Sequence, residues 1–170
     1  MAITSYMLSQ WHSAFRWWGL GLTLLLCSLN SQAQPLNELT QQAEQGDANA
    51  QLELAKRYFN GIGLPRDYKQ AFVWLKLSAA QGQIDAQYYL GWMYAHGKGF
   101  EKDPKQAFYW VQLAAQQNDG QAQYLLAQFY DSGFGVEQST IQAHAWYQKA
   151  CTHRVHLACL KVKSKPHVLD

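Results

Sequence analysis

The fold is decided by the stretch DAQYYLGWMYAHGKGFEKDPKQAFYWVQLAA, residues 85–115, because its pattern recurs 36 residues earlier and 36 residues later. Self-similarity at a fixed period is the signature of a repeat protein. Many aligned positions keep the same residue in all three copies, with no insertion between them. They are Ala50, Ala86 and Ala122; Gln51, Gln87 and Gln123; Leu54, Leu90 and Leu126; Tyr58, Tyr94 and Tyr130; Gly61, Gly97 and Gly133; Gly63, Gly99 and Gly135; Ala71, Ala107 and Ala143; and Trp74, Trp110 and Trp146.

The first half of each copy is typical of an amphipathic helix. Ala50, Leu54 and Tyr58 follow one another at intervals of four residues, which places them on one helical face. A Gly-x-Gly pair then follows, and glycine allows the left-handed backbone that ends a helix and reverses the chain. The position beside the stripe is always small, which lets another helix approach closely; it holds Ala55, Gly91 and Ala127.

The second half of each copy predicts a second helix. Ala71, Trp74 and Ser78 share one face, so we expect the recurring tryptophan in the core. Pro104 suits the first turn of this helix in the middle copy. The third copy has Ser139 where the first has Asp67, which leaves the start of its second helix less well defined. No stretch alternates with a period of two, so the chain is predicted to be all-α.

The predicted architecture is an αα-hairpin solenoid of three 36-residue repeats with a partial helical cap at each end. Its predicted segments are a signal peptide over 1–33, an N-terminal cap helix over 34–46, repeats over 47–82, 83–118 and 119–154, and a C-terminal cap helix and tail over 155–170.

The N-terminal segment predicts export. The apolar run from Trp17 to Cys27 is shorter than the about 20 residues that span a bilayer, and Ser31-Gln32-Ala33 resembles a signal-peptidase site. Translation could start at Met1 or at Met7. Removal of residues 1–33 leaves 13 basic and 12 acidic residues, a balance that favours neither nucleic acid nor anionic lipid as a partner. We therefore expect a periplasmic or secreted protein with no membrane insertion after signal cleavage.

The repeat unit closely resembles the Sel-one-like repeat, a relative of the tetratricopeptide repeat with a longer loop between its helices. The resemblance rests on Asp85-Ala-Gln-Tyr-Tyr-Leu-Gly-Trp-Met-Tyr, on Gly97-Lys-Gly99, and on Lys105-Gln-Ala107 followed by Trp110. It implies a right-handed solenoid with a concave face and a role as an adaptor for other proteins. It implies no cofactor.

Two cysteines remain after signal cleavage, Cys151 and Cys159. The repeat phase places Cys151 at the end of one helix and Cys159 in the first turns of the next, so the chain reverses between them. Some secreted members of the family have two cysteines at the same spacing, and the resemblance therefore implies a disulfide. A metal site that adds His153 and His156, or two free thiols, are the alternatives.

The resemblance also implies where a partner binds. In the tetratricopeptide arrangement the first helix of each unit lines the concave face. Carried over by repeat phase, one row of partner-binding positions is Leu52, Tyr88 and Tyr124, and the next is Lys56, Trp92 and Gln128. Aromatic anchors dominate the energy of many interfaces. The alternative is that these side chains only pack against the neighbouring repeat.

The expected function is an exported helical-repeat scaffold for protein–protein interaction in the bacterial cell envelope. Because a few secreted members of the family carry a β-lactamase description, a hydrolase of β-lactams or cell-wall amides is one alternative. The chain has no Ser-x-x-Lys, Lys-Thr-Gly, Gly-x-Ser-x-Gly or His-Glu-x-x-His motif, so no catalytic or metal-binding residue is assigned. A structural protein that binds peptidoglycan is the other alternative.

Overall fold

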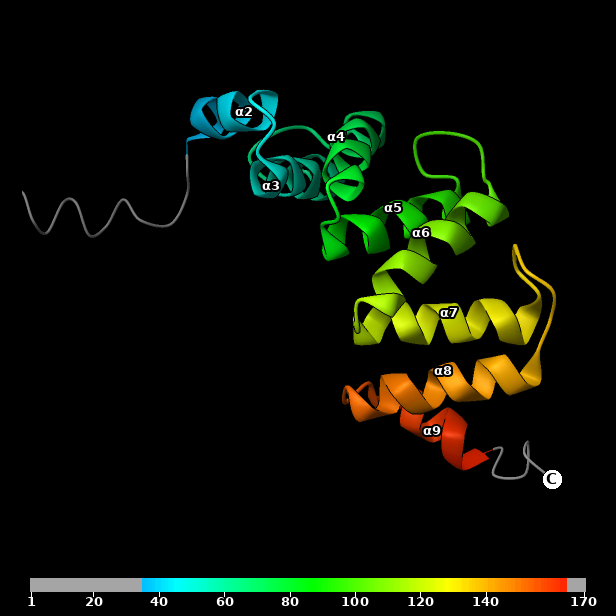
Figure 1. Cartoon of the computed structure of the whole chain (residues 1–170). Coiled ribbons are helices and arrows are strands. Elements are labelled where there is room, and N and C mark those ends of the chain that lie inside the picture. Colours follow the sequence, from blue (N-terminus) through cyan, green and yellow to red (C-terminus); the bar gives the residue numbers. More distant parts are fainter. Residues whose placement is uncertain (1–34, 165–170) are drawn as a thin grey trace, which may run out of the picture. The chain divides into compact units, whose positions relative to one another are not determined.

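The computed structural model describes residues 35–164, and every regular element in this part of the chain is a helix (Figure 1). The helices are α2 (Leu36–Glu44), α3 (Ala48–Asn60), α4 (Tyr68–Ala80), α5 (Ile84–His96), α6 (Pro104–Gln116), α7 (Gly120–Ser132), α8 (Thr140–Thr152) and α9 (His156–Ser164). From α3 to α9 each helix packs against the next along the chain. None of the described helices is long and apolar enough to cross a membrane.

The all-α repeat fold predicted from the sequence is confirmed. The pairs α3–α4, α5–α6 and α7–α8 are the three helical hairpins, and α2 and α9 are the partial helices expected at the two ends. The predicted signal peptide, with both candidate start sites, lies outside the described residues. The last six residues of the predicted C-terminal tail, 165–170, also lie outside them.

The first helix of each repeat ends where the sequence predicts. Gly61, Gly97 and Gly133 adopt left-handed backbone with φ of 74°, 64° and 71°, and the N–H of each bonds to a carbonyl in the last turn. An L-residue at such a position is strained, so glycine ends the helix without a penalty. The loop that follows leads the chain back along the helix it has just left.

The second helix of each repeat begins at a side-chain cap. Asp67 and Asp103 each accept hydrogen bonds from the backbone N–H groups of the second and third residues of α4 and α6. Ser139 does the same for α8, where its hydroxyl accepts from the backbone N–H of Gln142 at 3.3 Å. Serine is a good helix cap, so the third repeat starts its second helix despite the departure from aspartate.

The sequence predicted the recurring tryptophans in the core of the second helices, and this prediction is wrong. The structure shows Trp74, Trp110 and Trp146 only partly buried. The buried residue is the next one along: Leu75, Val111 and Tyr147 are 1%, 0% and 5% exposed. The tryptophan rings cover the edges of the core clusters instead.

Candidate interaction surface

The first row of predicted partner-binding residues lies at the junctions between repeats. Leu52, Tyr88 and Tyr124 are all partly buried. Leu52 packs on the core cluster shared by α3, α4 and α5, and Tyr88 on the cluster that includes α6 and α7. Tyr124 packs on the last cluster and meets the ring of Tyr147 at 5.7 Å. The row therefore contributes to packing while leaving part of each side chain accessible.

The second row has a different character in each repeat. The Lys56 ammonium group donates to the Asp85 carboxylate on the next repeat at 2.7 Å. Trp92 is partly buried, and Gln128 is exposed with its amide donating to the Tyr124 hydroxyl at 3.4 Å. The structure thus places an ion pair, an indole and an amide along three successive first helices.

Trp92 is held in a cluster of aromatic rings that spans two repeats. Its indole meets the Phe59 ring of α3 edge-on, with centroids 5.5 Å apart, and stacks on the His96 ring at 4.0 Å. Phe59 also contacts the ring of Tyr89 at 5.7 Å. Edge-to-face and offset-stacked pairs are the preferred aromatic geometries, so each ring fixes the orientation of the next.

Sequence reasoning missed Phe59, Tyr89 and His96 as members of this surface. Phe59 lies three residues after Lys56 and His96 four after Trp92, spacings that put each pair on one helical face. We call the whole set the first-helix surface; it comprises Leu52, Lys56, Phe59, Tyr88, Tyr89, Trp92, His96, Tyr124 and Gln128.

The phenol of Tyr88 stays uncharged in this setting. Burial raises its pKa above the ordinary value, and the neighbouring Tyr89 and Asp119 raise it further. A protonated phenol can both donate and accept a hydrogen bond. Tyr88 therefore offers an apolar ring with a polar tip.

A ladder of buried glutamines joins the repeats. Gln51, Gln87 and Gln123 each donate a side-chain N–H to the backbone carbonyl eight residues earlier, at 3.1, 3.3 and 3.2 Å. The side-chain oxygens of the first two are also satisfied, because Gln81 donates to Gln51 and Gln117 to Gln87, both at 2.8 Å. Buried polar groups need such partners, so each rung fixes one repeat on the next.

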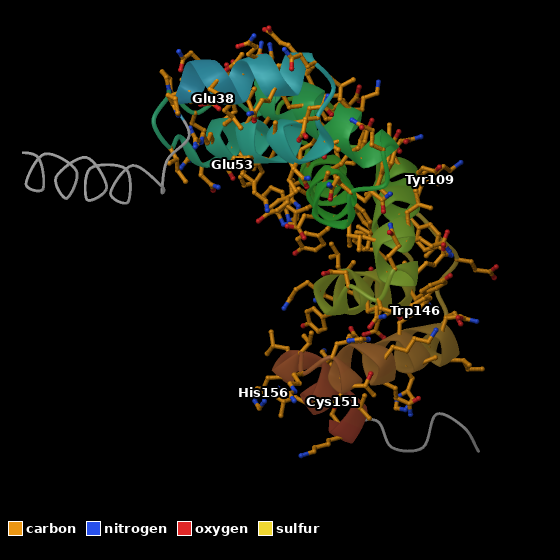
Figure 2. All side chains as sticks on the ribbon, turned by 60° about the vertical axis from the view of Figure 1, so that its left-hand side comes forward. Glu38, Glu53, Tyr109, Trp146, Cys151 and His156 are labelled. Carbon is orange, nitrogen blue, oxygen red and sulfur yellow. A yellow bond between two sulfur atoms is a disulfide. The ribbon has the colours of Figure 1, made fainter. Side chains whose placement is uncertain are left out.

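The disulfide occupies the next rung of this ladder. By repeat phase Cys159 stands where Gln51, Gln87 and Gln123 stand, and Cys151 stands where the carbonyl-bearing alanines stand. The two cysteines are bonded, with their Cα atoms 4.7 Å apart, which confirms the predicted disulfide. Cys151 lies on α8 (Figure 2). The bond removes both thiolates that the alternative metal site would need, and no other group of three metal-binding side chains occurs among residues 35–164.

The third rung is incomplete. Gln123 is 1% exposed, and its Oε1 atom has no hydrogen-bond partner among the described residues. The residue that stands where Gln81 and Gln117 donate is His153, whose side chain is exposed. The missing donor is thus a consequence of one departure from the repeat pattern.

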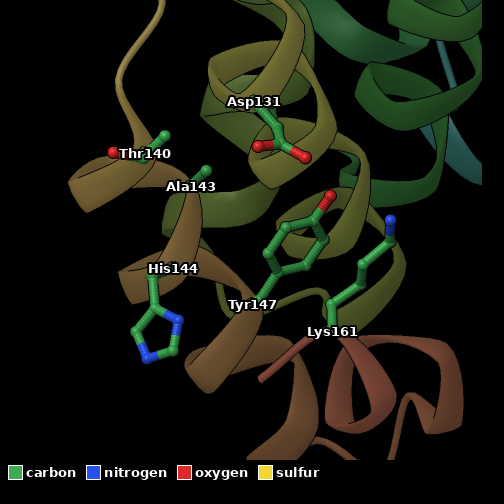
Figure 3. A pocket seen from close by; sticks show the side chains of 6 residues that line it. All are labelled: Asp131, Thr140, Ala143, His144, Tyr147 and Lys161. Atoms are coloured by element: carbon green, nitrogen blue, oxygen red, sulfur yellow. The ribbon is translucent and has the colours of Figure 1, made fainter. Parts of the chain in front are cut away.

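A small polar pocket lies beside the last hairpin (Figure 3). It is lined by Asp131, Thr140, Ala143, His144, Tyr147 and Lys161. Burial, followed by the nearby Asp131 and Tyr124, raises the pKa of Tyr147 to about 12. The cavity volume is about 10 Å³, which is close to the space of one water molecule.

The fold defines an αα-hairpin repeat protein, and the first-helix surface on α3, α5 and α7 is accessible to a partner. Residues 48–83, 84–119 and 120–153 each match the Sel1 repeat, and together these segments make up more than half of the sequence. The chain therefore belongs to the Sel1 repeat family.

Solved structures show the same fold. A Sel1 repeat protein from Oxalobacter formigenes is 39% identical, with a TM-score of 0.69 over 76% of this chain and 97% of that one. The antigen c5321, described as a protective antigen of uropathogenic Escherichia coli strains, is 31% identical with a TM-score of 0.62; the match covers 78% of this chain but 36% of the antigen. The Helicobacter pylori cysteine rich protein B is 23% identical, covering 75% and 96%, with a TM-score of 0.58. A comparison with curated proteins found no match.

Proposed function

We propose that this protein is an exported scaffold that binds a protein or peptide partner on the first-helix surface. The observation that carries the proposal is the aromatic cluster of Phe59, Tyr89 and Trp92, which comes from two repeats and keeps part of each ring accessible. Tryptophan and tyrosine are the residues most enriched among binding hot spots.

The rings are pre-organised for binding. Trp92 is fixed between Phe59 and His96, and the Lys56–Asp85 ion pair ties the same two first helices together. A side chain that is already ordered loses little conformational freedom when a partner covers it, so more of the contact energy appears as affinity.

Two observations support a location outside the cytoplasm. A disulfide persists in oxidising compartments, and Cys151 and Cys159 form one. The apolar run from Trp17 to Cys27, followed by Ser31-Gln32-Ala33, also resembles an export signal. Intact mass of the protein recovered from the periplasm tests this point: a chain that starts at Gln34 is expected, and an unprocessed chain in the membrane fraction would contradict it.

The partner surface is tested by site-specific photo-crosslinking in the native host. A photoreactive amino acid at position 128 reports on the first-helix surface, and the same group at position 109 is the matched control, because Tyr109 is half-exposed on α6. We expect a protein adduct from position 128 and none from position 109. An adduct that muramidase digestion shortens would identify peptidoglycan instead and overturn the proposal.

Two substitutions separate binding from stability. Trp92→Ala removes the central ring, and Gln128→Arg places a bulky charge on an exposed position that contributes little packing. The readout is capture of the cross-linked partner by purified protein that carries no photoreactive group; we expect both substitutions to abolish capture, while Tyr109→Ala leaves it unchanged. The melting temperature of Gln128→Arg should stay within a degree or two of the parent. Capture of the partner that survives Gln128→Arg would show that the partner binds elsewhere.

We further propose that the protein has no hydrolytic activity. A nucleophile needs an adjacent base, and the sequence has no Ser-x-x-Lys, Lys-Thr-Gly, Gly-x-Ser-x-Gly or His-Glu-x-x-His motif that would supply the pair. Purified protein is expected to leave nitrocefin unchanged, with and without a chelator. Turnover above that of a mock preparation would refute this.

A further inference from the structure

The near-neutral net charge conceals an uneven distribution along the described chain. Residues 35–137 carry eleven acidic and eight basic side chains, whereas residues 138–164 carry four basic ones and no acidic one. The basic residues of this last part are Lys149, Arg154, Lys161 and Lys163. Neither of the ion pairs Lys56–Asp85 and Arg57–Glu53 involves these four cations; the Lys149 ammonium group lies 4.0 Å from the centre of the Trp146 ring, and Lys161 lines the same pocket as Asp131. All four are exposed.

The terminal helix α9 combines this charge with exposed apolar groups. Ala158 is buried against α8, while Leu157 and Leu160 on the other side of the helix are 56% and 49% exposed. Lys161 follows Leu157 by four residues and Lys163 follows Leu160 by three, so a lysine flanks the leucines on each side. Basic residues near an anionic bilayer each contribute about 1 kcal/mol of attraction, and exposed apolar groups beside them can enter the interfacial layer.

Another repeat helix, such as one from a second copy of the chain, does not fit against the exposed face of α9. The second helix of each repeat approaches the first at a small residue: a Cβ on Gly91 would lie 2.5 Å from a methyl carbon of Val111. The equivalent position is Ala55 in the first repeat and Ala127 in the third, but it is Lys163 in α9. A lysine there blocks the close approach, so a second copy of the chain cannot extend the stack at α9.

The helix is also held rigidly enough to present a surface. The disulfide ties its first turn to α8, and Val155 and Ala158 pack in the core cluster of the last hairpin. In Figure 2 Cys151 and His156 mark this end of the domain, while Glu38 and Glu53 lie on α2 and α3 at the other.

We infer that the exposed face of α9 binds the surface of an anionic phospholipid bilayer. The lysines lie where they can contact lipid phosphates, and their aliphatic stems leave Leu157 and Leu160 free to enter the interfacial layer. This contact is peripheral and does not span the bilayer. Binding through α9 would bring the protein to a membrane and leave the first-helix surface free for its partner.

Vesicle flotation tests the inference with the protein as the bacterium processes it. The vesicles contain phosphatidylcholine alone or with 30 mol% phosphatidylglycerol, in 150 mM salt. Lys161→Gln with Lys163→Gln should weaken binding to the anionic vesicles about 25-fold, since each basic residue near such a surface contributes roughly fivefold. Leu157→Ser with Leu160→Ser should weaken it roughly tenfold. The N-terminal segment is common to all variants, so differences between them report on α9.

Two matched controls lie on α4. Lys69→Gln with Lys76→Gln makes the same change in net charge, and Val73→Ser with Leu77→Ser removes apolar groups that are 49% and 47% exposed. Both controls should bind within about twofold of the parent. Failure of the parent to bind anionic vesicles would overturn the inference, as would equal losses in the α9 and α4 variants. Loss with the lysine pair alone, together with competition by soluble polyglutamate, would assign the face to an acidic polymer and reject the membrane.

Discussion

Replacing His153 by glutamine should complete the glutamine ladder and stabilise the protein. In the first two rungs the donor comes from Gln81 and Gln117, each 2.8 Å from the acceptor oxygen. At the third rung the Oε1 atom of Gln123 is buried with no partner among the described residues, and His153 stands at the donor position. A glutamine at 153 has the same backbone setting as its two counterparts, at the end of a second helix.

The expected gain is about 1 kcal/mol. A buried acceptor without a partner costs about 1–3 kcal/mol. Ordering a glutamine side chain costs up to about 1.5–2 kcal/mol when it is fully immobilised, and less here because Gln81 and Gln117 remain largely exposed. For a domain of this size the difference corresponds to a rise in melting temperature of about 3–5 °C.

The assay is urea and thermal unfolding of the oxidised protein, followed by circular dichroism. Gln123→Met removes the acceptor, so His153→Gln should gain nothing in that background, and the double-mutant cycle isolates the new bond. The reverse exchange, Gln117→His, should destabilise by a similar amount. If His153→Gln has no effect and Gln117→His costs nothing, the ladder does not stabilise the junctions and the reasoning is wrong.

Three further perturbations test a close contact between the two helices of one repeat, a turn with left-handed backbone, and the disulfide. Gly91→Ala should destabilise the protein by about 1–3 kcal/mol in urea unfolding, because the new Cβ would lie 2.5 Å from a methyl carbon of Val111. Adding Val111→Leu should recover much of that loss, because it copies the Ala55–Leu75 pair of the first repeat. Arg154→Gly should stabilise by about 1 kcal/mol, since Arg154 has φ of 63° where Gly46 and Gly82 stand in the earlier turns; an unchanged or lower melting temperature would contradict this. Cys151→Ala with Cys159→Ala should lower stability by roughly 2.5 kcal/mol in the chain-entropy model, and thiol titration of the denatured oxidised parent should find no free cysteine in the processed chain.

The fold followed from the sequence because each repeat restates the same local signals. Leu54, Leu90 and Leu126 are all 1% exposed or less, and the glycines that end the first helices share one backbone geometry. Agreement among three copies averages out the ambiguity that a single helix would leave. The burial of the recurring tryptophans was predicted wrongly because a residue that recurs in every repeat was taken to be buried. A large ring can cover the edge of a core and remain partly exposed.

The candidate surface was only partly predictable because some of its residues do not recur in every repeat. Phe59 has Ala95 and Asp131 at its equivalent positions, and Tyr89 has Glu53 and Leu125, so neither belongs to the repeat pattern. Phe59 contacts both Tyr89 and Trp92, and these contacts depend on how two first helices are placed side by side, which is a tertiary property. The glutamine ladder could have been found, because a polar residue that recurs beside a buried alanine needs a fixed partner.

Among residues 35–164, the covalent cross-link Cys151–Cys159 lies at the last junction, so the two ends of the domain respond differently to mechanical load. If the ends were drawn apart, α2 and the early repeats could peel away one at a time, since side-chain packing and hydrogen bonds alone hold their junctions. The segment between Cys151 and Cys159 could not lengthen, so the stretched chain would fall roughly 2–2.5 nm short of its full contour. The α8–α9 corner would stay closed and offer a template on which the released repeats could reassemble when the force is removed.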